Sequence, residues 1–108
     1  MGGMGVVGSW RARVGRPGGE TVSEFEFAQD GTATLVLGGK GSGTWTATGA
    51  GTFSYRILEE HAEGSIEIAQ DAVLQGDGFV SSGITTVRLA DGSTVREAHI
   101  RITAIRRT

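Results

Sequence analysis

The sequence predicts an all-β chain that folds as one eight-stranded antiparallel up-and-down β-barrel. First, the 108 residues include 19 glycines and one proline, and the glycines fall between segments in which apolar and polar residues alternate. Second, eight such segments follow one another. Third, every join between them is too short to hold a crossover helix, which favours antiparallel neighbours. A chain of this length has one core, so residues 1–108 are predicted to form a single domain.

The eight segments are separated by typical turn sequences such as Asp30-Gly31 and Asp91-Gly92. They cover residues 7–14, 20–28, 32–38, 43–48, 52–59, 65–74, 79–89 and 94–105. Eight strands that twist in one hand tend to close, and closure leaves no unpaired edge. The alternative is a β-sandwich, which needs Greek-key connections longer than these joins.

The first three segments supply one wall of the interior. Trp10 in the first segment is expected beside Phe25 in the second, and Leu35 in the third is expected between Phe25 and Trp45. Their alternate positions carry charged side chains such as Glu24, which we expect in water.

The fourth and fifth segments form a hairpin about Gly49-Ala50-Gly51. This turn pairs Trp45 with Tyr55, so that aromatic side chains share one face and threonines the other.

The last three segments complete the barrel. The joins are expected to place Ile68, Thr85 and Ala98 in succession beyond Tyr55, with Arg96 opposite Val87. Loop lengths put the mouth of the barrel near four residues: Arg16, Lys40, His61 and Asp91.

Two short features resemble the signature of the lipocalins and other calycins. They are Gly8-Ser9-Trp10 at the start of the first strand and Arg106 after the last one. In that family the tryptophan plugs the closed end of the barrel and a basic side chain packs across its ring, an arrangement that a cation and an indole favour. The chain is also similar in size to small actinobacterial barrel proteins, including cyclases of polyketide pathways. Nine arginines, one lysine and no asparagine are typical of a high-GC genome. The resemblance implies an interior that works without a cofactor.

Three polar side chains on the predicted inner face are candidates for ligand contact. Tyr55 could bind a ligand carbonyl or act as a weak acid, or it could simply pack. Arg96 could meet an anion or extend into solvent from the rim. Gln70 lies among small residues, which either leave room for a ligand or fit a narrowing barrel. Tyr55 and Arg96 are the candidates for catalysis. The predicted ligand-binding set is Phe25, Leu35, Trp45, Tyr55, Ile57, Ile68, Gln70, Thr85 and Arg96.

Several other classes of site are not expected. His99 is predicted to face outward and His61 lies in a loop near Glu59, so neither a metal site nor a Ser/His/Asp triad is expected. Residues 38–43 are glycine-rich, but a strand follows them where a phosphate loop needs a helix. A net charge of −2 with scattered basic residues argues against nucleic-acid binding, and the absence of cysteine excludes disulfides and thiolate chemistry. No segment is apolar enough for a signal peptide or a membrane span, so a cytoplasmic protein is expected.

Three functions fit this pattern. The first is binding of one small hydrophobic molecule in the barrel. The second is a cofactor-free cyclase or isomerase that acts on a polyketide-like substrate in the same cavity. The third is a filled barrel that serves as an interaction module. Val80 and Ile84, expected on the outer face of the seventh strand, suggest a homodimer contact.

Overall fold

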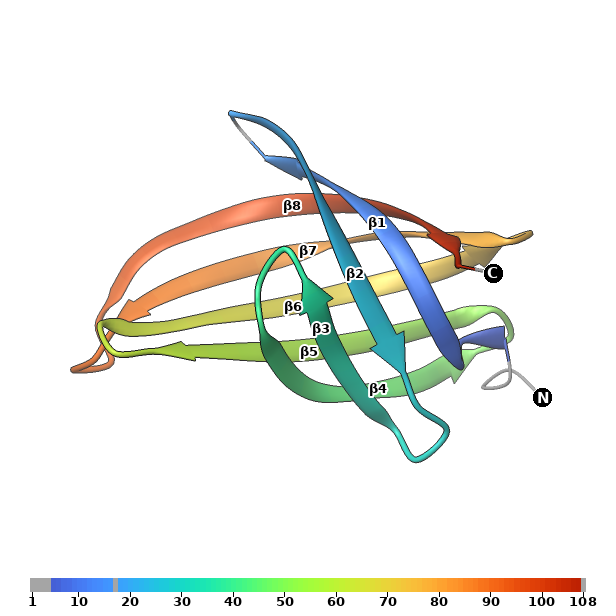
Figure 1. Ribbon diagram of the computed structural model, residues 1–108, viewed down its shortest axis with the longest axis horizontal. Helices are drawn as coiled ribbons and strands as arrows, with labels where there is room; N and C mark the ends of the chain where they lie inside the picture. The colour runs from blue at the N-terminus through green and yellow to red at the C-terminus, as the bar shows by residue number, and fades with distance from the viewer. Residues whose placement is uncertain (1–4, 17, 108) are drawn as a thin grey trace.

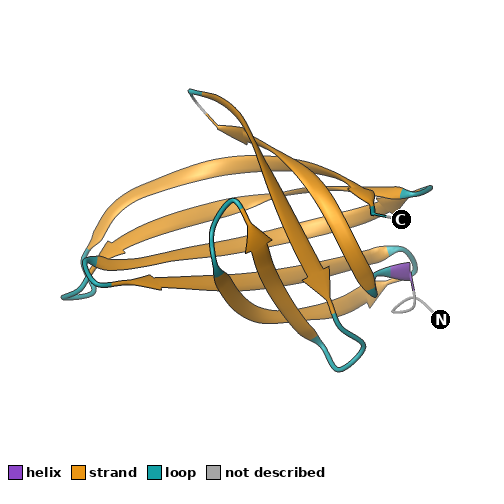
Figure 2. Cartoon of the chain, in the orientation of Figure 1, coloured by secondary structure: helices purple, strands orange, loops and turns teal. Residues whose placement is uncertain are grey.

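The computed structural model describes residues 5–16 and 18–107 and forms a closed antiparallel barrel with its eight strands in sequence order (Figure 1). The predicted fold class is confirmed. The strands are β1 (Gly8–Arg16), β2 (Gly19–Phe27), β3 (Thr32–Leu37), β4 (Gly41–Gly49), β5 (Thr52–His61), β6 (Gly64–Gln75), β7 (Gly78–Leu89) and β8 (Thr94–Arg106). Strands account for most of the described chain, and short turns join them (Figure 2).

The strands differ in length, which makes the barrel uneven at its mouth. β3 has 6 residues whereas β8 has 13, and β8 pairs with β1 only between Arg101 and Arg106. The first half of β8 therefore extends past the seam. In Figure 1 the turns β5–β6 and β7–β8 lie together at one end of the molecule, while the end of β1 and the start of β2 project away from them. In the described chain the first half of β8 is thus paired with β7 alone.

Six aromatic side chains fill the half of the barrel that lies away from the mouth. Neighbouring ring centroids in this cluster lie between 5.0 and 6.2 Å apart. The members are Trp10, Phe25, Phe27, Phe53, Tyr55 and Phe79, and all are buried. Separations of this size are those of rings in direct contact, so the cluster is a packed core.

The floor of the barrel is built around Trp10. Its Nε1 donates a hydrogen bond to the Val6 carbonyl at 2.9 Å, and the Arg106 Cζ lies 4.2 Å from its ring centroid. The predicted packing of Arg106 across Trp10 is confirmed. Gly8 has a φ of 140°, and a Cβ at this position would lie 2.6 Å from the Arg106 Nη1. Because Gly8 has no Cβ, the Arg106 guanidinium can occupy the space beside it.

The predicted strand register is correct for several pairs and wrong for others. Trp10 pairs with Phe25, Trp45 with Tyr55 and Val87 with Arg96, as expected. Leu35, however, pairs with Gly41 and does not lie beside Trp45. The cause is that β4 begins at Gly41, two residues earlier than predicted, which shortens the turn and shifts the register.

The β5–β6 hairpin differs from the prediction in a similar way. β5 continues to His61 and β6 begins at Gly64, which leaves a two-residue turn. As a result Tyr55 pairs with Gln70, and Ile68 pairs with Ile57 instead.

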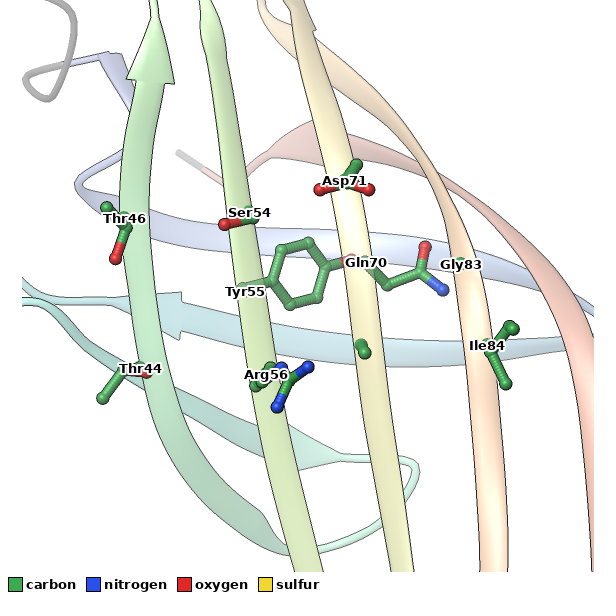
Figure 3. A pocket seen from close by; sticks show the side chains of 10 residues that line it. Thr44, Thr46, Ser54, Tyr55, Arg56, Gln70, Asp71, Gly83 and Ile84 are labelled. Atoms are coloured by element: carbon green, nitrogen blue, oxygen red, sulfur yellow. The ribbon is translucent and has the colours of Figure 1, made fainter.

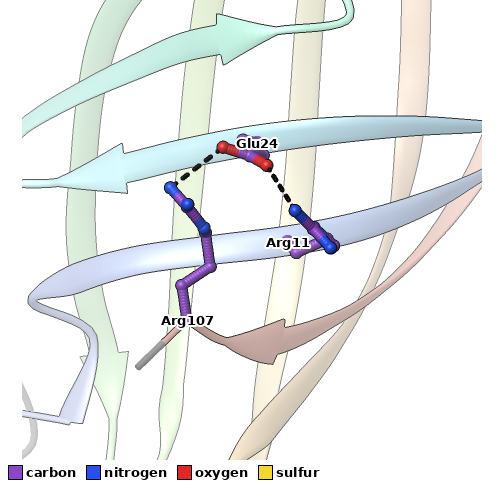
Figure 4. A network of polar contacts seen from close by, with 3 residues as sticks. All are labelled: Arg11, Glu24 and Arg107. Atoms are coloured by element: carbon purple, nitrogen blue, oxygen red, sulfur yellow. Dashed lines mark hydrogen bonds and ion pairs between the residues drawn. The ribbon is translucent and has the colours of Figure 1, made fainter.

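Glu24 lies on the outer face, as predicted, but it is shielded from water. The Arg11 Nη2 lies 3.2 Å from its Oε2 and the Arg107 Nη1 lies 3.0 Å from its Oε1 (Figure 4). Only 12% of the Glu24 side chain is exposed. Because Arg11 belongs to β1 and Arg107 follows β8, this carboxylate links three neighbouring segments across the seam of the barrel. We call these three residues the Glu24 clasp.

Candidate functional site

The polar groups in the middle of the barrel are bonded to one another. The Tyr55 hydroxyl lies 2.9 Å from the Ser81 Oγ, and the Ser81 Oγ donates a hydrogen bond to the Gln70 Oε1 at 2.8 Å. The Gln70 Nε2 in turn donates to the Ile100 carbonyl at 3.2 Å. Since the Ser81 hydroxyl donates its hydrogen bond to Gln70, the Tyr55 hydroxyl is the donor in its hydrogen bond with Ser81. The phenol, the serine and the amide therefore form one chain of hydrogen bonds.

This chain of hydrogen bonds gives the Tyr55 hydroxyl and the Gln70 amide partners inside the protein. Tyr55 is 1% exposed and Gln70 is 3% exposed. Burial raises the pKa of the Tyr55 phenol well above its usual value, and the hydrogen bond with Ser81 offsets only part of that effect. The phenol is therefore neutral, and its hydroxyl group is already hydrogen-bonded within the core.

A small chamber lies between this hydrogen-bonded chain and the mouth. Its volume is about 50 Å³, far below the 300 Å³ or more that an ordinary ligand pocket needs. Four predicted residues line it: Phe25, Leu35, Ile68 and Thr85. A volume of this size holds a water molecule or the end of a ligand, but not a whole one.

A larger pocket of about 350 Å³ opens at the mouth, on the inner face of the extended β7–β8 hairpin. Two arginines, Arg16 and Arg96, stand on its rim. The other lining residues are Gly18, Thr85, Val87, Ala98 and Ile100, and they form a mainly apolar floor. Arg16, Thr85 and Ile100 also line the inner chamber, so the two spaces adjoin. We call them the mouth pocket and the inner chamber.

The rim arginines are free to meet a ligand. Both side chains are exposed, and within residues 5–16 and 18–107 neither forms an ion pair. Arg16 donates one hydrogen bond, from its Nε to the Thr21 Oγ1 at 3.0 Å, which leaves its terminal nitrogens available. An anion above the floor of the mouth pocket would therefore find guanidinium donors without displacing an internal carboxylate.

Glu59 is the residue of this site that sequence reasoning missed. Its side chain lines the inner chamber, and the residue is only 7% exposed. The neighbouring Glu60 and His61 suggest an acidic loop, yet Glu59 shares the alternation of Phe53, Tyr55 and Ile57, which face the interior. That parity is the signal that identifies it.

The remaining predicted residues belong to the core. Ile57 is fully buried. Trp45 is half-buried, and its Nε1 donates to the Ala28 carbonyl at 2.7 Å in the turn at the floor end of the barrel. Neither residue lines the mouth pocket. The structure thus brings Phe25, Leu35, Ile68 and Thr85 to the inner chamber and Arg96 to the rim beside Thr85.

A separate groove of about 480 Å³ lies on the outer face of β4 to β7 (Figure 3). Its lining includes Thr44, Thr46, Arg56 and Asp71, which are exposed, and Ile84, which is 46% exposed. In Figure 3 these side chains project from the outer surface of the strands. The groove is open and shallow, and it does not connect with the chamber residues. A dimer contact through Val80 and Ile84 stays a prediction.

The described residues offer no sign of a metal centre. His61 and His99 are both exposed, and no group of three or more His, Cys, Asp or Glu side chains could hold an ion in the part of the chain that the structure describes. Nor does that part contain a helix long and apolar enough to cross a membrane.

Comparison of this chain with known proteins finds no match. No family model matches the chain, and no curated protein or solved structure matches it either. The site therefore has to be interpreted from its own geometry.

Proposed function

We propose that this protein binds a small molecule with an apolar body and an anionic group, such as a carboxylate, in the mouth pocket. The observation that carries the proposal is the pair of rim arginines, which form no ion pair with any residue that the structure describes, above a floor of Thr85, Val87, Ala98 and Ile100. Buried apolar area would supply most of the affinity. The guanidinium groups would select a planar anion and set its orientation.

This proposal moves the ligand from the deep interior to the mouth. The aromatic rings pack against one another in the floor half of the barrel, and Tyr55, Ser81 and Gln70 are hydrogen-bonded to each other. A lipocalin-like origin remains part of the proposal, supported by the plugged floor at Trp10 and Arg106 and by the open opposite end.

A second candidate is a cofactor-free cyclase or isomerase, and the observation in its favour is Glu59. A carboxyl group on the wall of the inner chamber could take a proton from the buried end of a substrate and return it elsewhere on the same molecule. Catalysis of this kind requires turnover, whereas a carrier releases its ligand unchanged. Product analysis by mass spectrometry of every compound that binds separates the two.

Binding at the mouth can be tested by NMR titration with alkanoates and arylalkanoates, each matched with the corresponding alcohol. The tryptophans lie away from the mouth, so the amide signals of Thr85, Val87 and Ala98 are better reporters than indole fluorescence. We expect acids to shift these signals more strongly than alcohols. Arg96→Ala and Arg16→Ala should each weaken acid binding by about tenfold, the effect of one charged hydrogen bond.

The matched control is Arg101→Ala, which removes the same charge from the outward face of β8. It should leave the affinity nearly unchanged. The proposal is wrong if the acids do not bind, if they bind no better than the alcohols, or if all three variants lose affinity equally.

A further inference from the structure

Glu59 has an unusual environment for a carboxylate. It is 7% exposed and lines the inner chamber together with apolar side chains such as Leu35 and Ile68, while Arg16 lines the same chamber where it adjoins the mouth pocket. Within the described ranges no arginine, lysine or histidine lies within ion-pair distance of it. Its one hydrogen bond comes from the backbone N–H of Lys40, which lies 3.1 Å from Oε1. A buried carboxyl group with a single neutral donor is poorly compensated for the loss of water.

The turn between β3 and β4 fixes the position of this carboxylate. Gly39 has a φ of 148°, and a Cβ there would collide with the Glu59 Oε1 and approach the Leu35 Cδ2 to 2.8 Å. A Cβ on Gly38 would lie 2.6 Å from the Ser23 Oγ. The two glycines allow the turn to lie directly over Glu59 and Ser23, so Oε1 is held by Lys40 and cannot turn away freely.

The second carboxylate oxygen of Glu59, Oε2, is therefore available to accept a hydrogen bond. Oε2 has no hydrogen bond from any described residue, and the same is true of the Ser23 Oγ, which also lines the chamber. In the described chain every fully buried side-chain polar atom has a partner. Atoms without one must then border open space, and the inner chamber is a space that both residues line.

The size of the chamber limits what can enter it. Its volume of about 50 Å³ has room for a few water molecules but is far smaller than a whole ligand needs. Because the mouth pocket adjoins the chamber through Arg16, Thr85 and Ile100, a ligand lying in the pocket could insert only its leading end. A hydroxyl group is small enough and donates the hydrogen bond that a carboxylate accepts.

We propose that Glu59 determines specificity by accepting a hydrogen bond from a hydroxyl group at the inner end of the ligand. The ligand class is thus a hydroxylated acid with an apolar body, whose anionic end meets Arg16 and Arg96 and whose hydroxyl end meets the Glu59 Oε2. This inference rests on the proposed function. A molecule without the donor leaves the carboxylate desolvated and unpaired, and sites of this kind reject such molecules strongly.

The test compares para-hydroxyphenyl alkanoates of increasing chain length with their para-fluorophenyl counterparts. Fluorine is close to a hydroxyl group in size but donates no hydrogen bond. Affinity is measured by NMR titration against the native protein, and the amide signals of Lys40 and Glu59 report the inner chamber. We expect the hydroxyl compound of the best-fitting length to bind at least about tenfold more tightly than its fluoro counterpart, and to shift both signals.

Glu59→Gln is the decisive variant. Its amide oxygen can still accept the Lys40 N–H, while its NH₂ group replaces the free acceptor with a donor. The preference for the hydroxyl compound should fall to about twofold or less. The hydroxyl compound loses its carboxylate acceptor, and the fluoro compound binds more tightly because it no longer leaves a desolvated carboxylate unpaired. Glu60→Gln is the matched control, because it removes the same charge from the adjacent, exposed position. It should keep the full preference.

The outcomes separate this inference from the proposed function. If neither series binds, the mouth site itself is wrong. If both series bind through Arg16 and Arg96 with equal affinity, the mouth site stands and the role of Glu59 is wrong. A hydroxyl preference that survives in Glu59→Gln also overturns it.

Discussion

The hydroxyl of Tyr55 lies within a cluster of aromatic rings, where no water can solvate it. Its partner is the Ser81 Oγ at 2.9 Å, and the Ser81 hydroxyl in turn donates a hydrogen bond to the Gln70 Oε1. A polar group in such surroundings stabilises the fold only while each donor and acceptor remains matched. The three side chains therefore act together.

Removing one member of this chain should have different effects from removing another. Tyr55→Phe removes the phenol oxygen and leaves the serine with its bond to Gln70, so a loss of about 0.5 to 1.5 kcal/mol is expected. Ser81→Ala leaves both the phenol and the amide oxygen buried without this partner, which should cost about 1 to 3 kcal/mol. Urea unfolding measures both. An Ser81→Ala variant as stable as the native protein would contradict the matched chain.

Tyr55 also predicts how stability depends on pH. Its pKa in the folded state is raised above the value of about 10 that it has in an unfolded chain. The contribution of Tyr55 to the free energy of unfolding is therefore complete below about pH 10. It is lost as the pH rises from there toward the pKa of the folded state, because in that range only the unfolded chain releases the phenol proton. Tyr55 is the single tyrosine. In an alkaline titration, the absorbance of tyrosinate should thus appear only as the β-sheet circular dichroism signal is lost. Ionisation of Tyr55 near pH 10 while the protein is still folded would contradict this prediction.

At the scale of strands, β1 and β8 meet at the floor of the barrel. Trp10 on β1 fills the floor, its ring packs edge-on against Phe79 of β7 with centroids 5.0 Å apart, and the Arg106 guanidinium at the end of β8 lies over the ring. The contact between Trp10 and Arg106 depends on β1 and β8 keeping their register.

Trp10→Ala should therefore destabilise the protein by about 3 to 5 kcal/mol, the usual effect of truncating a buried aromatic side chain. Trp45→Ala is the comparison, because Trp45 is only half-buried and should cost less. Thermal unfolding followed by circular dichroism gives both values. Equal midpoints for Trp10→Ala and native protein would rule out the plug.

Local pattern was sufficient to predict the strands. Alternation identified all eight of them, whereas the packing of Arg106 over Trp10 followed from the resemblance to the calycin signature. Exact pairing depended on turn length, which glycine-rich stretches do not define well. The turn before Gly41 was predicted too long, and this placed Leu35 beside the wrong residue.

The site was harder to predict than the fold for a similar reason. Period-two alternation shows which face a side chain is on, but not whether Tyr55 or Gln70 finds a protein partner across the barrel. The mouth pocket depends on the unequal lengths of β1 and β8, a property of the closed sheet that no single segment contains. The face of Arg96 follows from the alternation of its own strand, and its pairing with Val87 follows from the short turn between β7 and β8.

At the scale of the whole molecule, the Glu24 clasp holds the barrel seam from outside. Glu24→Gln should destabilise the protein by about 1 to 2 kcal/mol, because it weakens two contacts to arginines that are themselves about half exposed. Glu26→Gln is the control, an exposed position on the same face of β2. Urea unfolding at low and high salt measures the difference, which should shrink as salt screens the pairs. Identical effects of the two substitutions would contradict the clasp.

The seam between β1 and β8 also bears on the order in which the molecule assembles. Every other pairing in the barrel joins consecutive strands, whereas this one brings Trp10 to Arg106. Bringing together residues so far apart along the chain carries a larger entropy loss than forming any of the hairpins, and contacts of this kind slow folding. We therefore expect the hairpins to form early and the seam to close last. The time that the barrel takes to fold is then set by the meeting of its first and last strands.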